Sequence, residues 1–320
     1  MDFHILIANV TNPTLLFFAL GAFAVIVKSD LEIPESSSKF ISLYLLFSIG
    51  FKGGQELAHG GFSAEIISSL LFGLVVASVI PLYTFFILKS TMSVSDAGAV
   101  SAAYGSVSAV TFVAAVSFLD SQNIAFGGHM VAVMALMESP AIIVGVMLLM
   151  KYDPDNRSEG KIFETIKHSF TNGSVLMILG SMLIGLIADT KQAEGIKPFT
   201  TDIFKGFLAI FLLEMGMLTA RRFSVFKKYG WFAAVFAIMV PMTNGCIVAA
   251  LSGLITHDIG NRFIFSILAA SASYIAVPAA MRLAAPKADP GLYIPMALGI
   301  TFPFNITIGM PMYYLIVNAI

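Results

Sequence analysis

The chain alternates long runs of hydrophobic residues with short polar stretches along nearly all of its 320 residues. About 20 mostly apolar residues are enough for a helix to cross the hydrocarbon core of a bilayer. The longest polar stretch between two hydrophobic runs, Lys151 to His168, is too short to be a domain. The pattern therefore predicts an all-α, polytopic membrane protein with ten transmembrane helices, at residues 12–28, 38–56, 63–89, 96–119, 127–150, 172–188, 202–220, 229–255, 261–285 and 291–318.

The predicted helices repeat. Residues 102–111 and 269–278 share five of ten positions at an offset of 167, and three residues of the second predicted helix recur in the seventh at an offset of 166. The chain thus divides into a first repeat (1–150), a connection (151–171) and a second repeat (172–320). Because each repeat has five helices, an odd number, the second copy must be inverted relative to the first. Inverted repeats are typical of secondary transporters.

Composition narrows the functional class. Hydrophobic residues make up 58% of the chain, charged residues only 12%, and the mean hydropathy is +0.88, whereas a soluble domain has about 25% charged residues. The net charge of −1 and the absence of a basic patch argue against a nucleic-acid partner. One cysteine, Cys246, excludes an internal disulfide and a cysteine metal cluster. We expect no cofactor, and no phosphate-binding GxxxxGK[ST] motif for an ATP-driven pump is present.

Lysine and arginine in short loops predict the orientation, because cytoplasmic loops carry an excess of them. Thirteen of the 18 basic residues lie in loops on one side, which includes the 151–171 connection. The other side holds Lys52, Lys191, Lys197, Lys205 and Arg262. The connection is therefore predicted to be cytoplasmic, and both termini are predicted to lie outside.

The fourth and ninth predicted helices contain the repeated stretch, and both carry small and polar residues where a membrane helix usually has leucine. We expect helix breaks near Gly105–Ser108 and Ala272–Ile275. Each break would create a half-helix whose N-terminus offers free N–H groups and a partial positive charge. Two such ends can bind an anion without a basic side chain. No lysine or arginine lies between Thr91 and Asp120. The alternative is two unbroken helices with small residues at close-packed faces.

An ionisable residue within a membrane helix usually has a function. Glu138 in the fifth predicted helix corresponds to Asn305 in the tenth at an offset of 167, and both lie near a proline and a hydroxyl residue. Carboxylate, amide and hydroxyl oxygens together suit Na⁺. The alternative is a protonated Glu138 with a hydrogen bond inside the bundle. Glu214 in the seventh predicted helix corresponds to Ser48, and for it a structural or subunit-contact role competes equally with a functional one.

Several functions remain open from these residues alone. One is a symporter for a small anion or organic acid; another is a cation/proton antiporter that uses Glu138. A third, of another class, is a receptor or assembly subunit that does not transport. An intramembrane enzyme is disfavoured, because the predicted helices contain no Ser–His pair, paired aspartates or metal-ligand set.

Four stretches resemble the sodium-dependent bicarbonate transporter family of cyanobacteria, over residues 11 to 318: residues 33–36 (IPES), 49–54 (IGFKGG), 269–279 (AASASYIAVPA) and 298–305 (LGITFPFN). The resemblance implies a ten-helix inverted-repeat fold. A gate or scaffold domain would contain the spans 12–28, 38–56, 172–188 and 202–220, and a core domain with crossed broken helices would contain 63–150 and 229–318. It further implies homotrimers in a bacterial plasma membrane that import bicarbonate with Na⁺.

The resemblance also implies the site residues. The anion would contact residues from both breaks, and Na⁺ would lie near Glu138, Asn305 and Thr301, with the Ser108 and Ser273 hydroxyls as further candidates. The family usually has aspartate where Glu138 stands. A PII-like regulatory partner is implied too, although the 151–171 connection is shorter than in the cyanobacterial members, which argues against it. The implied anion ligands are Gly105, Ser106, Val107, Ser108, Ala272, Ser273 and Tyr274.

Overall fold

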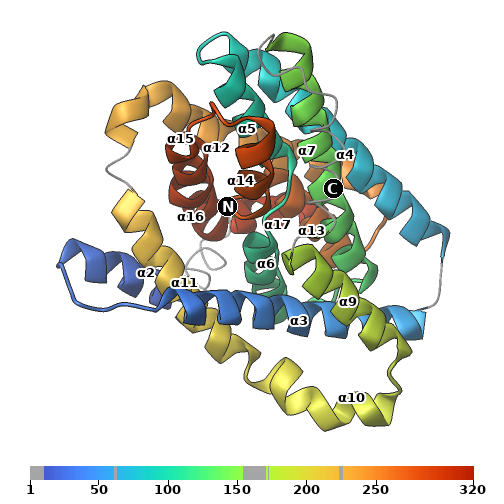
Figure 1. Ribbon diagram of the computed structural model, residues 1–320. Helices are drawn as coiled ribbons and strands as arrows, with labels where there is room; N and C mark the ends of the chain where they lie inside the picture. The colour runs from blue at the N-terminus through green and yellow to red at the C-terminus, as the bar shows by residue number, and fades with distance from the viewer. Residues whose placement is uncertain (1–10, 61–62, 154–170, 172, 223–225) are drawn as a thin grey trace.

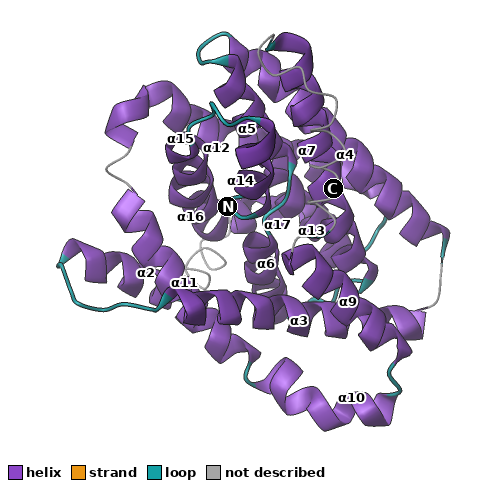
Figure 2. Cartoon of the chain, in the orientation of Figure 1, coloured by secondary structure: helices purple, strands orange, loops and turns teal. Residues whose placement is uncertain are grey.

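The computed structural model describes residues 11–60, 63–153, 171, 173–222 and 226–320, and this part of the chain contains helices but no strand (Figures 1 and 2). The 151–171 connection lies almost entirely outside the described residues. The helices are α2 (Pro13–Ile26), α3 (Glu35–Gly60), α4 (Ala64–Lys89), α5 (Val94–Gly105), α6 (Ala109–Ser121), α7 (His129–Tyr152), α9 (Gly173–Ile187), α10 (Thr190–Lys197), α11 (Phe204–Arg222), α12 (Phe226–Leu251), α13 (Ile259–Ala270), α14 (Ala276–Ala284), α15 (Pro290–Pro295), α16 (Phe302–Phe304) and α17 (Met310–Ala319).

Six helical segments in the described chain are long and apolar enough to cross a membrane: Ala64–Lys89, Val94–Ser121, His129–Tyr152, Thr190–Arg221, Gly230–Leu254 and Pro290–Ala319. Three shorter apolar helices, α2, α9 and α13, overlap other predicted spans. The protein is therefore an all-helical, polytopic membrane protein in its described part. The full number of ten spans stays a prediction, as does the inverted repeat.

Two predicted boundaries differ from the structure. The loop expected between residues 188 and 202 is instead the helix α10, which Asp189 caps at its N-terminus, followed by a π-helical turn at Pro198–Asp202. The span expected at 291–318 is not one regular helix, because π-helical turns at Met296–Thr301 and Asn305–Gly309 interrupt it. Prolines recur along this segment, and each lacks the N–H group that a regular α-helix needs.

Glycines allow two pairs of helices to pack closely, α3 against α9 and α2 against α11. A Cβ atom added at Gly50 of α3 would lie 2.6 Å from the Ile178 carbonyl oxygen of α9. One added at Gly216 of α11 would lie 2.0 Å from the Phe18 carbonyl oxygen of α2. Gly50 and Gly216 correspond to each other in the predicted repeat, so related positions bring the backbones together in both pairs.

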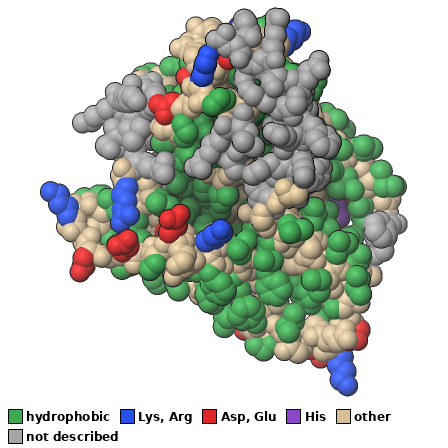
Figure 3. All heavy atoms as spheres, in the orientation of Figure 1, with side chains coloured by type: hydrophobic (Ala, Val, Ile, Leu, Met, Phe, Trp, Pro, Cys, Tyr) green, Lys and Arg blue, Asp and Glu red, His purple; other side chains and the backbone are tan. Residues whose placement is uncertain are grey.

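The interior contains two hydrophobic clusters. One includes side chains of α3, α6, α7, α11 and α13, and the other lies mainly among α5, α7, α12 and α14. Large apolar side chains are also exposed along α4 and α9, among them Leu71 and Leu183, which are 58% and 54% exposed. Hydrophobic side chains cover wide areas of the face in view, between separate groups of charged ones (Figure 3). Such a surface suits contact with lipid rather than water.

Candidate functional site

The first predicted break lies between α5 and α6. Helix α5 ends at Gly105, and α6 begins at Ala109 after an extended Ser106 and the N-cap residue Ser108. The Ser108 hydroxyl accepts a hydrogen bond from the Thr111 N–H (3.2 Å), a normal N-cap interaction. Gly105 fits where no side chain would, because an added Cβ would lie 2.4 Å from Pro81 Cδ. The prediction that this segment is broken is therefore confirmed.

The second predicted break lies between α13 and α14. Helix α13 ends at Ala270, and α14 begins at Ala276 after a non-helical stretch, residues 271–275. Pro278 occupies the first turn of α14, where its missing N–H group costs no intrahelical hydrogen bond. The Ser273 hydroxyl lies 3.5 Å from the Val277 nitrogen and accepts its hydrogen bond. This segment too is broken at the predicted position.

The two breaks are bonded to each other. The Ser108 N–H donates to the Ser271 hydroxyl oxygen (3.0 Å), and the Ser273 N–H donates to the Ala103 carbonyl oxygen (2.8 Å). Each break therefore satisfies a backbone group of the other. Buried backbone polar groups need such partners, and the need is strongest within a membrane.

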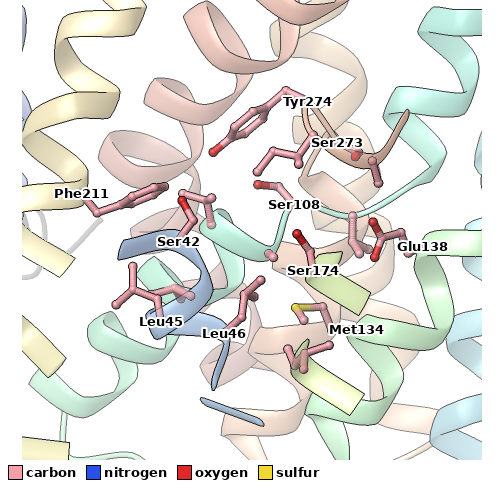
Figure 4. A pocket seen from close by; sticks show the side chains of 17 residues that line it. Ser42, Leu45, Leu46, Ser108, Met134, Glu138, Ser174, Phe211, Ser273 and Tyr274 are labelled. Atoms are coloured by element: carbon pink, nitrogen blue, oxygen red, sulfur yellow. The ribbon is translucent and has the colours of Figure 1, made fainter. Parts of the chain in front are cut away.

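A pocket opens beside both breaks (Figure 4). Its lining includes the first helical residues of both second half-helices, Ala109 and Val110 of α6 and Ala276 of α14. The N–H groups in the first turn of a helix have no intrahelical acceptor, and the partial positive charge of the helix is concentrated there. Two such ends at one cavity favour a negatively charged ligand. The pocket is also small, with a volume of about 40 Å³.

Glu138 reaches the same pocket from α7, and it is the only charged side chain among the described residues that line it. In Figure 4 it lies across the cavity from Phe211 of α11. The Ser106 hydroxyl donates to the Glu138 carbonyl oxygen (3.3 Å), which joins the first break to α7. A carboxylate between two positive helix ends and two serine hydroxyls combines features suited to an anion and to a hard cation.

The structure brings together only some of the predicted site residues. Val107, Ser108, Ser273, Tyr274 and Glu138 line the pocket. The other residues of the breaks, Gly105, Ser106 and Ala272, are buried beside it and are not among its lining residues.

Thr301 and Asn305 do not line the pocket, and both are fully buried. The Thr301 hydroxyl donates to the Ala237 carbonyl oxygen (2.7 Å). The Asn305 amide donates to the Ala270 carbonyl oxygen at the end of α13 (2.7 Å). Asn305 therefore stabilises the second break without lining the pocket, whereas Glu138, its counterpart in the predicted repeat, faces the pocket.

Sequence reasoning missed the opposite wall of the pocket. Ser42, Leu45 and Leu46 come from α3, Ser174 and Ile178 from α9, and Phe211 from α11. The Tyr274 hydroxyl contacts this wall, because it lies 3.6 Å from Met215 Sδ of α11. Nothing in these apolar stretches distinguishes the residues from ordinary packing positions, apart from the hydroxyls of Ser42 and Ser174.

Comparison with known families identifies the chain. The family model described as the Na⁺-dependent bicarbonate transporter superfamily matches residues 13–318. The chain belongs to this superfamily. Membership implies Na⁺-dependent transport of bicarbonate in general terms, and it favours transport over catalysis. No curated protein matches the chain.

Proposed function

We propose that this member of the bicarbonate transporter superfamily is a secondary active symporter that imports bicarbonate together with Na⁺. One observation carries the proposal: the starts of α6 and α14 and the carboxylate of Glu138 line the same pocket. The anion binds between the two half-helix N-termini, near Ser108, Ser273 and Tyr274. No lysine or arginine is among the described lining residues, so the helix ends supply the positive potential.

The size of the pocket favours a small anion over a bulkier organic acid. The pocket is a small cavity of about 40 Å³ between packed side chains, and a small anion fits into it. Bicarbonate has few heavy atoms, whereas an organic acid with a longer carbon chain would have to displace the surrounding side chains.

Na⁺ binds beside the anion, at Glu138. The Ser108 and Ser273 hydroxyls line the same pocket and provide further oxygen ligands, the type that hard cations prefer. Thr301 and Asn305, which we predicted as ligands, contribute indirectly by holding α12 and the end of α13. A cation at Glu138 neutralises the carboxylate that would otherwise repel the anion. Each ligand therefore raises the affinity for the other by the same factor.

The four helices at the predicted gate positions, α2, α3, α9 and α11, pack as two glycine-mediated pairs. We infer that they form a gate domain, which supplies Ser42, Ser174 and Phe211 to the pocket, and that the breaks, α7 and α12 belong to a core domain. The ten spans form two inverted repeats, and the core domain moves against the gate domain around the site. The protein assembles as a homotrimer in a bacterial inner membrane with both termini outside. The short 151–171 connection argues against regulation by a PII-like partner.

Uptake of labelled bicarbonate into proteoliposomes tests the proposal. We expect uptake that depends on an inward Na⁺ gradient and that a K⁺ gradient does not replace. Glu138→Asp keeps the carboxylate and retains Na⁺ dependence, while Glu138→Gln loses it. Uptake that is independent of Na⁺ contradicts the coupling, and bicarbonate binding without flux indicates a receptor. Proton efflux coupled to Na⁺ entry without bicarbonate indicates an antiporter instead.

A further inference from the structure

A second cavity, larger than the pocket, lies between α3, α6 and the beginning of α11. Its volume is about 250 Å³, and we call it the lysine cavity. Part of its wall is the π-helical turn at Pro198–Asp202, a type of distortion that is frequent at functional sites. The polar residues that line it are Ser48, Lys52, Asp120, Thr200, Thr201 and Lys205.

Ser48 indicates that the lysine cavity binds a ligand. This side chain is 1% exposed, and its hydroxyl oxygen has no hydrogen-bond partner among the described residues. The neighbouring Tyr44 hydroxyl interacts with Ser48, but it donates its own hydrogen to the Phe199 carbonyl oxygen (2.6 Å) and so cannot donate to Ser48. A buried hydroxyl oxygen that receives no hydrogen bond is costly, and a ligand or water that donates to it removes that cost. In this cavity the Ser48 hydroxyl can serve a bound molecule.

The hydrogen-bond donors of the lysine cavity suit an oxyanion, although its charges are balanced. Lys52 and Lys205 are exposed side chains from two helices, α3 and α11, and both line the cavity. Ammonium groups and a hydroxyl are hydrogen-bond donors that suit carboxylate-like oxygens. Two carboxyl groups oppose them, because Asp120 also lines the cavity and Glu56 follows Lys52 by one turn of α3. The affinity of the lysine cavity for an anion is therefore modest, and removal of any one of these charges should change it.

The lysine cavity and the pocket share three helices. On α3, Leu45 lines the pocket and Ile49 lines the lysine cavity. On α6, Val113 lines the pocket and Val116 lines the lysine cavity. On α11, Phe211 faces the pocket, and Lys205 lies further toward the start of the helix. Three or four residues along a helix correspond to roughly 5 Å. Buried apolar side chains of these helices separate the two cavities by about one helical turn.

We propose that the lysine cavity is a second anion site, in which Lys52, Lys205 and Ser48 capture bicarbonate before it reaches the pocket. The nature of the captured anion rests on the proposed function; the site itself does not. Capture raises the anion concentration in the lysine cavity, about one helical turn from the pocket. When the buried apolar side chains between the two cavities move apart, the anion passes to the N-termini of α6 and α14. Electrostatic capture of this kind raises association rates and weakens with salt.

A set of charge-neutralising substitutions tests the capture role in transport. Lys52→Gln and Lys205→Gln are expected to raise the KM for bicarbonate about threefold each, the size expected for one unit charge acting across roughly 6 Å of water. The kcat stays unchanged, and Lys→Arg variants behave as the parent. Asp120→Asn is expected to lower the KM by a similar factor. If Asp120→Asn instead raises the KM as the lysine variants do, the three residues are a structural ion network and the proposal is overturned.

A binding measurement without transport separates this inference from the proposed function. Thr201→Cys, in a Cys246→Ser background, places one thiol in the lysine cavity. The anionic reagent methanethiosulfonate ethylsulfonate is expected to modify it faster than a cationic analogue, and bicarbonate is expected to slow the reaction. Adding Lys52→Gln reduces the preference for the anionic reagent about threefold. Absence of both preference and protection overturns the site, whereas protection in a protein that does not transport bicarbonate overturns only the proposed function.

Discussion

Thr301→Val is the substitution whose effect the structure defines most closely. Thr301 is fully buried, and its hydroxyl donates to the Ala237 carbonyl oxygen (2.7 Å) and bonds the Tyr104 hydroxyl (2.8 Å). Ala237 needs this donor because Pro241, four residues later in α12, has no N–H group to offer. Valine has nearly the shape of threonine, so the substitution removes the two hydrogen bonds and changes little else.

The expected loss of stability follows from the groups left unpaired. An unpaired buried carbonyl costs about 1–3 kcal/mol, and the Tyr104 hydroxyl loses its partner too. We therefore expect Thr301→Val to cost about 2–4 kcal/mol. At roughly 2 °C per kcal/mol for a chain of this size, the midpoint of thermal unfolding falls by about 4–8 °C. Thr301→Ser retains the hydroxyl, and Tyr104→Phe leaves Ala237 bonded, so both should cost clearly less.

A double-mutant cycle gives the decisive measurement. Pro241→Ala restores an N–H group in α12 that can donate to the Ala237 carbonyl oxygen, which removes the need for Thr301. Thermal unfolding of the four purified proteins, followed by circular dichroism in one detergent, measures the coupling. We expect Thr301→Val to cost at least about 1 kcal/mol less in the Pro241→Ala background. An equal cost in both backgrounds would refute the reasoning, because Ala237 would then not be the group that Thr301 serves.

Three further predictions concern the site and the helix pairs. Ser273→Ala removes a pocket hydroxyl and an N-terminal hydrogen-bond acceptor of α14; we expect weaker transport at unchanged expression, and unchanged uptake kinetics would argue against the anion site. Ser271→Ala removes the oxygen that accepts the Ser108 N–H; a loss of about 1–3 kcal/mol should appear in thermal unfolding, and a stability equal to that of the parent would contradict it. Gly216→Ala places a methyl group against the α2 backbone and should cost about 1–3 kcal/mol, while Gly180→Ala, where an added Cβ has open space, is the control expected to cost little.

Both helix breaks could be predicted from the sequence because each has a characteristic local composition. Small and polar residues interrupt two otherwise apolar segments, and the interruption occurs twice at one offset. Ser108 is an N-cap residue, and Pro278 tolerates the first turn of a helix. These are local preferences of the backbone, so they can be recognised without knowing what packs around them.

The partners of Glu138 could not be predicted in the same way. The predicted repeat pairs Glu138 with Asn305, yet Glu138 faces the pocket and Asn305 donates to the Ala270 carbonyl oxygen. Equivalent positions in a repeat share a place in the fold but not a hydrogen-bond partner. The gate side of the pocket and the lysine cavity were missed for a related reason. Their residues come from separate helices, and only the packing of those helices shows that Ser48 lacks a partner.

The paired hydrogen bonds between the breaks have a mechanical consequence. The Ser108 N–H donates a hydrogen bond to Ser271 of the second break, and the Ser273 N–H donates one to Ala103 at the end of α5. Movement of one break is therefore coupled to movement of the other. The proposed anion site is thus preassembled, and its geometry would not have to be rebuilt in each transport cycle. In the proposed symporter, alternating exposure of the site would then come from movement of the surrounding helices past the two breaks, and selection of the anion would depend on the breaks themselves.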